Sequence, residues 1–375
     1  MKILMICTEK LPVPPVRGGA IQTYIAGIAP ELSLQHDITI LGITDPSLPN
    51  SERLGRIQFE RVPGKQFDLY AENVAGFLQG KHYDLIHVFN RPRLIGPVRQ
   101  MAPRSRIVLS MHNDMFTPDK ISPEDAQTAI NEVERIVTVS DYVGNAIAAL
   151  YPSAQPKLRT IYSGVDLGRY AKTSEANAIR HQLRSEHGIS DKKVILFVGR
   201  LSPKKGADIL VRSMQQVAQR HSDAALVIVG GKWYSDNEIS DYVAYVRALA
   251  ARSPVPVVTT GYVAADQVHH WFHAGDLFVC ASQWEEPLAR VHYEAMAAEL
   301  PIVTTARGGN PEVISLGQNG LLIETPEDPN AFGEKISMLL SDTGKMRMMG
   351  QQGRKLAEQR FGFSRVIREI LEVWR

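Results

Sequence analysis

Two glutamates, Glu286 and Glu294, are the residues of this sequence best placed to act together on one ligand. The apolar run 276–281 before them is typical of a buried strand, and the segment after them predicts a helix that begins between Pro287 and Arg290. Free N–H groups at the start of a helix attract anions. The two carboxylates would bracket that anion at most ~12 Å apart. This span suits a diphosphate with a sugar at one end and a ribose at the other.

Two cations, Arg200 and Lys205, lie in a loop between the predicted strand 194–198 and a predicted helix that ends near Arg220. Cations in such a loop can neutralise a diphosphate. The alternative for both pairs is a solvated surface, which is the commoner setting for isolated charges. The strand before Glu286, the proline after it and a Gly-Gly turn at 307–312 favour a binding site.

Further candidates follow other predicted strands. Gly18 and Gly19 precede a helix expected from about residue 20 to 35, and they would let a ligand approach the backbone closely, although a plain tight turn is the alternative. His112 follows strand 107–111, and Asn90 with Arg91 follows strand 85–89, at the ends where open parallel sheets bind ligands. A hydrogen-bonded structural histidine is the alternative for His112. The dinucleotide fingerprint G-x-G-x-x-G is absent, which argues against a dehydrogenase.

The composition sets broad limits on the class of protein. A chain of 375 residues is long enough for two domains, and 44% hydrophobic with 22% charged residues is ordinary for a globular protein. The net charge of +2 gives no general attraction to nucleic acid. Only Cys7 and Cys280 occur, which indicates a reducing, cytoplasmic compartment. No apolar run reaches the ~20 residues of a membrane span, and residues 1–7 are expected to form a strand rather than a signal peptide.

The order of the predicted elements indicates an α/β fold. Apolar strands and amphipathic helices alternate through the first half, and the alternation restarts after a polar stretch near 165–190. The strands are expected at 2–8, 37–43, 57–62, 85–89, 107–111, 136–139, 158–162, 194–198, 225–229, 255–260, 276–281, 301–305 and 321–323. The helices besides those already given are expected at 67–78, 124–135, 141–150, 331–340, 345–359 and 361–375, and the helix after Pro287 is expected to end near 300.

Three segments resemble a known family. The run Trp284–Ala297, the wider run Ser282–Met296 and the N-terminal Thr8–Pro14 resemble the retaining nucleotide-sugar glycosyltransferases of family 4, and most closely their spore-coat SA branch. The resemblance extends over nearly the whole chain and implies the GT-B fold, with two Rossmann-like, doubly wound parallel-sheet domains facing across a cleft. It implies an acceptor-side domain at 1–165, a linker region at 166–190, a nucleotide-sugar domain at 191–358 and a helix at 359–375 that crosses back to the first domain.

The resemblance also implies roles for individual residues. Glu286 would grip sugar hydroxyls with His112 beside the sugar, and these two are the expected catalytic residues. Glu294 would accept a hydrogen bond from the ribose. Asn90 and Arg91 are weaker candidates for contact with the acceptor. The expected donor-binding residues are Gly18, Gly19, Arg200, Lys205, Gly231, Tyr262, Val263, Glu286, Pro287, Leu288, Ala289, Arg290 and Glu294. The family usually has an aromatic residue and a glycine where this chain has Leu288 and Ala289, which leaves the identity of the sugar open.

The function expected from the resemblance is retaining transfer of a hexose from a nucleotide diphosphate sugar, with UDP-sugars as the default donor. The acceptor is open, and a role in spore-coat or cell-surface glycan synthesis is expected. No metal and no other cofactor is expected, because cationic side chains can neutralise the diphosphate. Two alternatives stay open: a structural spore-coat protein on a GT-B scaffold with little catalysis, and a sugar-nucleotide epimerase on the same fold.

Overall fold

The computed structural model describes residues 1–233, 238–314 and 317–375, which form two compact units. Unit 1 contains Met1–Gly164 together with Phe363–Arg375, and unit 2 contains Val165–Gly362. The chain therefore passes from one unit to the other twice. Residues 166–190, expected as the linker region, lie in unit 2 and contain a helix at 174–186, and the chain returns to unit 1 at Phe363, within the segment 359–375 expected to cross back.

Unit 1 is built on an eight-stranded sheet in the order β3-β4-β2-β1-β5-β6-β7-β8. Every neighbouring pair is parallel except β3 with β4, which is antiparallel. The strands are β1 (Lys2–Ile6), β2 (Asp37–Ile43), β3 (Ser51–Leu54), β4 (Ile57–Val62), β5 (Leu85–Phe89), β6 (Arg106–Met111), β7 (Arg135–Thr138) and β8 (Leu158–Thr160). β3 is the one strand of this unit that the sequence analysis did not predict.

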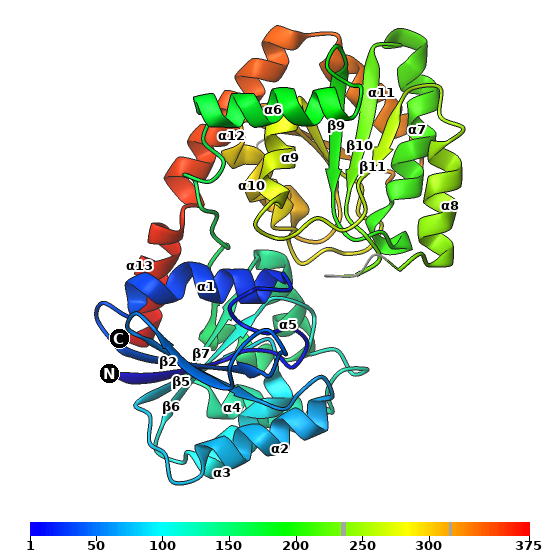
Figure 1. Ribbon diagram of the computed structural model, residues 1–375. Coiled ribbons are helices and arrows are strands. Elements are labelled where there is room, and N and C mark those ends of the chain that lie inside the picture. Colours follow the sequence, from blue (N-terminus) through cyan, green and yellow to red (C-terminus); the bar gives the residue numbers. More distant parts are fainter. Residues whose placement is uncertain (234–237, 315–316) are drawn as a thin grey trace. The chain divides into compact units, whose positions relative to one another are not determined.

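Helices cover both faces of this sheet (Figure 1). On one face α1 and α13 pack against the strands, and on the other face α2, α3 and α4 do so. The helices are α1 (Ala20–Leu32), α2 (Phe67–Leu78), α3 (Ile95–Met101), α4 (Pro123–Glu132), α5 (Asp141–Leu150) and α13 (Phe363–Trp374), with short 3₁₀ turns η1 (Pro92–Leu94) and η2 (Pro152–Lys157). Because both faces are covered, the central strands are mostly apolar, and the few polar side chains within them, such as His87 and Ser110, are buried.

Helix α13 is an integral part of unit 1. The Phe363 ring occupies space that side chains at Gly27 and Gly164 would fill, since a Cβ at either glycine would come within 2.3 Å and 2.5 Å of it. At the other end of the helix, the Trp374 indole N–H donates to His87 Nδ1 at 3.2 Å in the core. Arg106 of β6 donates to the Trp374 carbonyl oxygen at 2.7 Å.

Unit 2 has a six-stranded parallel sheet in the order β11-β10-β9-β12-β13-β14. This is the Rossmann order, in which the chain starts at a central strand, winds to one edge and then returns to build the other half. The strands are β9 (Lys193–Val198), β10 (Ala224–Val229), β11 (Val257–Thr259), β12 (Leu277–Cys280), β13 (Ile302–Thr305) and β14 (Gly320–Ile323). Strands β1, β2, β4, β5, β6 and β7 of unit 1 follow the same order.

The helices of unit 2 also lie on both faces of its sheet, with α7, α8 and α11 on one side and α6, α9 and α10 on the other (Figure 1). They are α6 (Ser174–Glu186), α7 (Ala207–Arg220), α8 (Asp241–Ala250), α9 (Val268–Ala274), α10 (Val291–Ala297), α11 (Pro329–Leu340) and α12 (Thr343–Arg360), with η3 (Pro203–Lys205) and η4 (Asn310–Val313). In the described part of the chain, no helix is both long and apolar enough to cross a membrane.

Candidate active site

The winding order of each sheet fixes where a site can form. In a doubly wound sheet, loops leave the first and fourth strands in opposite directions and open a crevice at the carboxyl ends of those strands. In unit 2 this point lies between β9 and β12, and in unit 1 it lies between β1 and β5. The predicted residues Lys205 and Glu286 follow β9 and β12, while Asn90 and Arg91 follow β5.

Unit 2 places Glu286 at the centre of a hydrogen-bonded cluster. Its side chain is 9% exposed, and Lys205 Nζ donates to both carboxylate oxygens at 2.9 and 2.7 Å. The Ser282 hydroxyl and the Trp284 indole N–H donate to Oε2 at 2.7 and 2.8 Å. Burial alone would raise the pKa of Glu286, but the charge of Lys205 and these donors hold the pKa below its ordinary value. The carboxylate is therefore ionised and fixed in orientation at neutral pH.

Two glycine-dependent turns hold this cluster in place. Gly206 ends η3 directly after Lys205 with φ +68°, and a Cβ there would lie 2.1 Å from the Ala281 carbonyl oxygen. Gly308 has φ +55°, and a Cβ there would lie 2.0 Å from the Glu286 carbonyl oxygen. Glycine relieves both the positive φ and the close approach. The turn at 307–312 thus supports the backbone of Glu286.

The helix after Glu286 differs from the predicted one. Arg290 is the N-cap, and α10 begins at Val291 and ends at Ala297, so it has seven residues. Pro287 lies outside the helix. The Ala289 N–H donates to Asn310 Oδ1 at 3.2 Å, so this amide is already engaged. A two-turn helix has a small dipole, and the expected anion attraction therefore depends more on the neighbouring cations than on α10.

Glu294 lies in the first turn of α10 and is paired with Arg290 at 3.2 Å. Both side chains are largely buried, with 15% and 16% exposure. Each of the two glutamates that the sequence analysis singled out is thus paired with a cation. Lys205 from the loop after β9 pairs with Glu286, and Arg290 pairs with Glu294. Leu288 and Ala289 lie between them and are each 8% exposed.

The remaining donor-binding candidates of unit 2 lie on loops after β9, β10 and β11. The Arg200 guanidinium lies over the Trp233 ring at 4.4 Å from its centroid. Gly231 accepts a hydrogen bond from the Leu201 amide at 2.8 Å, which joins the β9 and β10 loops. Tyr262 and Val263 follow β11 and are half-buried. Their expected contacts with a donor remain predictions.

Unit 1 gathers its own candidates at the ends of β1, β5 and β6. Asn90 has φ +56° and is 2% exposed, and its Oδ1 accepts from the backbone N–H groups of His112 and Asn113, both at 2.9 Å. The His112 ring packs edge-on against Tyr24, with 5.0 Å between centroids. Asn90 thus fixes the loop that carries His112. The contact of Asn90 with an acceptor stays a prediction.

Arg91 forms a buried pair with a residue that the sequence analysis did not select. Its Nε and Nη2 donate to the two Glu9 carboxylate oxygens at 2.5 and 2.9 Å. Burial would raise the pKa of Glu9, but Arg91 holds that pKa below its ordinary value. The pair joins the loop after β1 to the end of β5. The expected acceptor contact of Arg91 also remains a prediction.

Gly18 and Gly19 precede α1 with φ values of +88° and +107°, and Gly19 is the N-cap of that helix. A Cβ at Gly19 would lie 2.3 Å from Gln22 Oε1, so the positive φ and the close approach of Gln22 both favour glycine there. Sequence reasoning also missed Ser282, Trp284 and Asn310. Ser282 and Trp284 are close to Glu286 in sequence, whereas Asn310 reaches Ala289 across 21 residues.

No group of three or more His, Cys, Asp or Glu side chains that could hold a metal ion occurs in 1–233, 238–314 and 317–375. Cys7 and Cys280 are free and buried. Burial raises the pKa of the Cys7 thiol to about 12, so this thiol is not a nucleophile at neutral pH.

Two Rossmann-like domains, each with polar side chains gathered at its switch point, are the architecture of GT-B glycosyltransferases, and the comparisons identify that class. Residues 179–356 match the family model described as glycosyl transferases group 1, and residues 18–169 match the model described as glycosyltransferase family 4. The chain therefore belongs to the group 1, family 4-like glycosyltransferases.

Two relatives from Bacillus subtilis (strain 168) resemble the whole chain. The spore coat protein SA is 44% identical over 100% of this chain and 99% of its own length. The putative glycosyltransferase YtcC is 43% identical over 100% of this chain and 92% of its own length. The resemblance of the sequence to the family and to its spore-coat SA branch is thereby confirmed.

Solved structures share the fold at low identity. Anabaena Alr3699/HepE in complex with UDP and glucose has a TM-score of 0.80 and 22% identity, over 100% of this chain and 99% of the other. Sucrose-phosphate synthase from Thermosynechococcus elongatus also has a TM-score of 0.80, with 21% identity over 100% and 98% of the two chains. The GT-B fold predicted from the sequence is confirmed.

Proposed function

We propose that this chain transfers a hexose from a UDP-sugar to an acceptor with retention of anomeric configuration. The observation that carries the proposal is the buried, ionised Glu286 with Lys205 at the switch point of unit 2. Support for uridine comes from the UDP complex of the fold relative, and support for an enzyme comes from the family.

The proposed mechanism uses preorganised charge. As the glycosidic bond to the diphosphate breaks, negative charge develops on the phosphate and the anomeric carbon gains oxocarbenium character. Lys205 has three N–H donors, and two of them are used by Glu286. The third can donate to a phosphate oxygen while the pair stays intact. In this proposal Arg200 supplies a second positive charge, Glu286 holds sugar hydroxyls, Glu294 accepts from the ribose, and His112 lies beside the sugar.

We extend the proposal to metal independence, because Arg200 and Lys205 can take the part of a divalent cation at the diphosphate. The test is donor turnover in the presence of excess EDTA. Activity that is lost with EDTA and restored by magnesium or manganese would contradict this part and leave the glycosyltransferase assignment standing.

The test of the main proposal is donor binding and single-turnover chemistry. UDP should raise the unfolding midpoint of the protein, because a ligand that binds only the folded form stabilises it. Glu294→Ala should weaken UDP binding by about 10-fold, since a lost hydrogen bond of about 1.5 kcal/mol has that effect. Glu334→Ala, an exposed glutamate on α11, is the matched control. Equal UDP affinity in the Glu294 and Glu334 variants would contradict the role of Glu294.

A structural role in the spore coat is the second candidate, because the name of the 44% identical relative points to the coat. The proposed location is the cytoplasm, with the spore coat as the alternative. Single-turnover assays with labelled UDP-hexoses separate enzyme from scaffold. Product mass separates transfer from epimerisation, since an epimer keeps the mass of the donor.

A further inference from the structure

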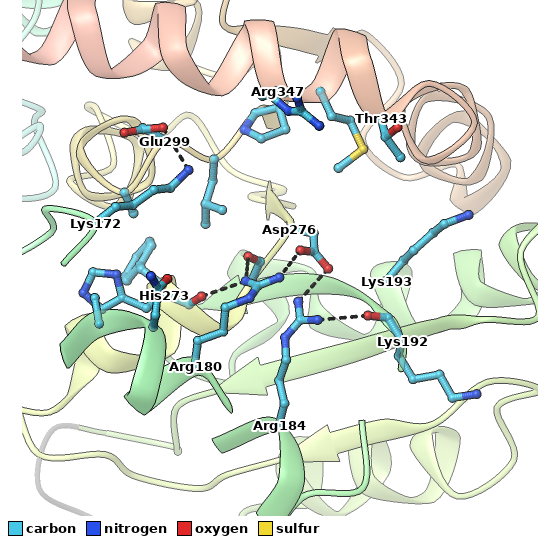
Figure 2. Close-up of a pocket in the computed structure, with 18 of the residues that line it drawn as sticks. Lys172, Arg180, Arg184, Lys192, Lys193, His273, Asp276, Glu299, Thr343 and Arg347 are labelled. Carbon is cyan, nitrogen blue, oxygen red and sulfur yellow. Dashed lines mark hydrogen bonds and ion pairs between the residues drawn. The ribbon is translucent and has the colours of Figure 1, made fainter. Parts of the chain in front are cut away.

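Unit 2 has a second site of interest, a cavity of about 530 Å³ (Figure 2). It lies at the opposite end of the sheet from Glu286 and Lys205. It opens where β9, β12 and β13 begin, at Lys193, Asp276 and Pro301. The candidate active site lies where β9 and β12 end. The length of the sheet therefore separates the two, and the proposed transfer reaction makes no use of this cavity.

The lining of the cavity is strongly basic. Six cationic side chains line it, with two carboxylates and His273. Figure 2 shows Thr343 and Arg347 on one side of the space and Arg180, Arg184 and Asp276 on the other. The six cations are Lys172, Arg180, Arg184, Lys192, Lys193 and Arg347, and the carboxylates are Asp276 and Glu299.

Part of this charge has a structural purpose. Arg180 and Arg184 clamp Asp276 at 2.5 and 2.6 Å and also donate to backbone carbonyl oxygens of residues 192 and 273–275. Asp276 in turn accepts from the Val194 N–H at 2.8 Å. These contacts fix α6 to the start of β9 and β12. The two arginines therefore form one wall of the cavity. Most of their guanidinium N–H groups already donate to Asp276 or to backbone carbonyl oxygens.

Lys172 is paired with Glu299, which also lines the cavity, at 2.8 Å, and three cations remain for a ligand. Lys192 lies 3.6 Å from Asp191, which is 79% exposed, and Lys193 lies 3.1 Å from Asp223, which is 49% exposed. Exposed pairs of this kind contribute little free energy, so an anion can replace them. Arg347 on α12 forms no ion pair with any residue that the structure describes. Its planar guanidinium presents paired N–H donors that suit a phosphate.

The rest of the lining is apolar. Phe272, Leu300, Pro301, Leu340 and Met346 contribute to it. A space of this size matches the usual pockets for small molecules, which combine apolar walls with a few placed polar groups. A free inorganic ion would leave those walls uncovered, whereas a phosphorylated compound with a ring or carbon chain would cover them.

We propose that this cavity is a second small-molecule site of unit 2 and that it binds a small phosphorylated compound. The phosphate group contacts Arg347 and the two lysines, 192 and 193, and the uncharged part packs on the apolar walls. Flexible lysine stems allow their ammonium groups to turn toward the phosphate.

The experiment is isothermal titration with glucose 6-phosphate as the probe and with glucose and inorganic phosphate as comparison ligands. Two variants remove cations from the cavity, Arg347→Glu and Lys192→Glu. Lys355→Glu is the matched control, because Lys355 is an exposed cation on the same helix, α12, and does not line the cavity.

We expect the wild type to bind glucose 6-phosphate more tightly than either comparison ligand, and less tightly as salt rises. Arg347→Glu should weaken this binding by about 10-fold or more, and Lys192→Glu by less, because reversing a charge adds repulsion to the lost contact. Lys355→Glu should stay within about 2-fold of wild type. Absence of binding to the wild type, or equal affinities in the Arg347 and Lys355 variants, would overturn the proposal. The second outcome would assign the bound probe to another site, including the candidate donor site.

Discussion

Lys205 Nζ lies 2.7 Å from Glu286 Oε2, in a setting where the glutamate is almost fully enclosed. Removing the lysine charge leaves a buried carboxylate with only the two neutral donors Ser282 and Trp284. We expect Lys205→Met to lower the free energy of unfolding of unit 2 by about 3 kcal/mol. Lys204→Met, a neighbouring change at an exposed lysine, should cost under about 0.5 kcal/mol. Chemical denaturation measures both, and equal stability of the two variants would contradict the buried-pair interpretation.

Gly308 should tolerate no side chain. Gly308→Ala adds a Cβ within 2.0 Å of the Glu286 carbonyl oxygen and also imposes a positive φ. Gly188→Ala imposes a similar φ, +65°, where nothing lies within 4 Å. The second change should cost about 1 kcal/mol and the first at least about 2 kcal/mol more. Matched urea titrations of the two variants give the difference, and a difference near zero would show that the turn shifts without strain.

Asn90 should be hard to replace for two separable reasons. Asn90→Gly keeps the positive φ and loses the two hydrogen bonds to the 112–113 backbone, at a cost of about 2 kcal/mol. Asn90→Ala loses the same two hydrogen bonds and also places an alanine, which disfavours positive φ, at this position. It should therefore lower the free energy of unfolding by about 1 kcal/mol more than the glycine variant does. The exposed Asn131 gives the control, Asn131→Ala. If the alanine variant proved as stable as the glycine variant, the strain at this position would be negligible.

Two buried histidines should make the protein less stable in mild acid. Burial lowers the pKa of His87 to about 3 and that of His292 to about 4. An unfolded histidine titrates near pH ~6.5, so the unfolded chain binds more protons below that pH. The stabilisation is complete above pH ~6.5 and is lost as pH falls toward the folded pKa values, by up to about 1.4 kcal/mol per pH unit for each histidine.

Denaturation between pH 7.5 and 5 measures this slope. His292→Gln should flatten it for unit 2, because glutamine can still bond Thr304 and does not titrate. The matched control is His82→Gln, since the His82 side chain is 64% exposed. An unchanged slope in the His292 variant would mean that other groups cause the acid sensitivity.

The sequence predicted the limits of strands and helices correctly where an apolar run is bounded by polar or turn-forming residues. The strands 37–43, 57–62 and 85–89 and the helices 67–78 and 141–150 have the predicted limits. Strand β3 was missed because Ser51–Leu54 carries charges and little apolar alternation; it exists through pairing with β4. Helices α3, α8 and α9 were also missed. The start of α10 was placed up to a turn too early, because proline marks a helix entrance only approximately.

The candidate site was predictable in its residue types but not in its pairings. That Glu286 and Lys205 meet depends on the order of β9 and β12 in the sheet, which a single sequence does not give directly. Glu9 with Arg91 and Asn310 with Ala289 join positions 82 and 21 residues apart. The basic cavity was missed for the same reason, since its lining comes from positions between 172 and 347.

Helix α13 belongs to unit 1 but is synthesised after all of unit 2. The first 164 residues make most of a folded body, yet its core stays open until Phe363 and Trp374 emerge from the ribosome. All of unit 2 is made in the interval and can complete its own sheet first. Until then the apolar side chains of α1 that pack with α13 in the core lack that cover, and exposed apolar surface of this kind favours aggregation.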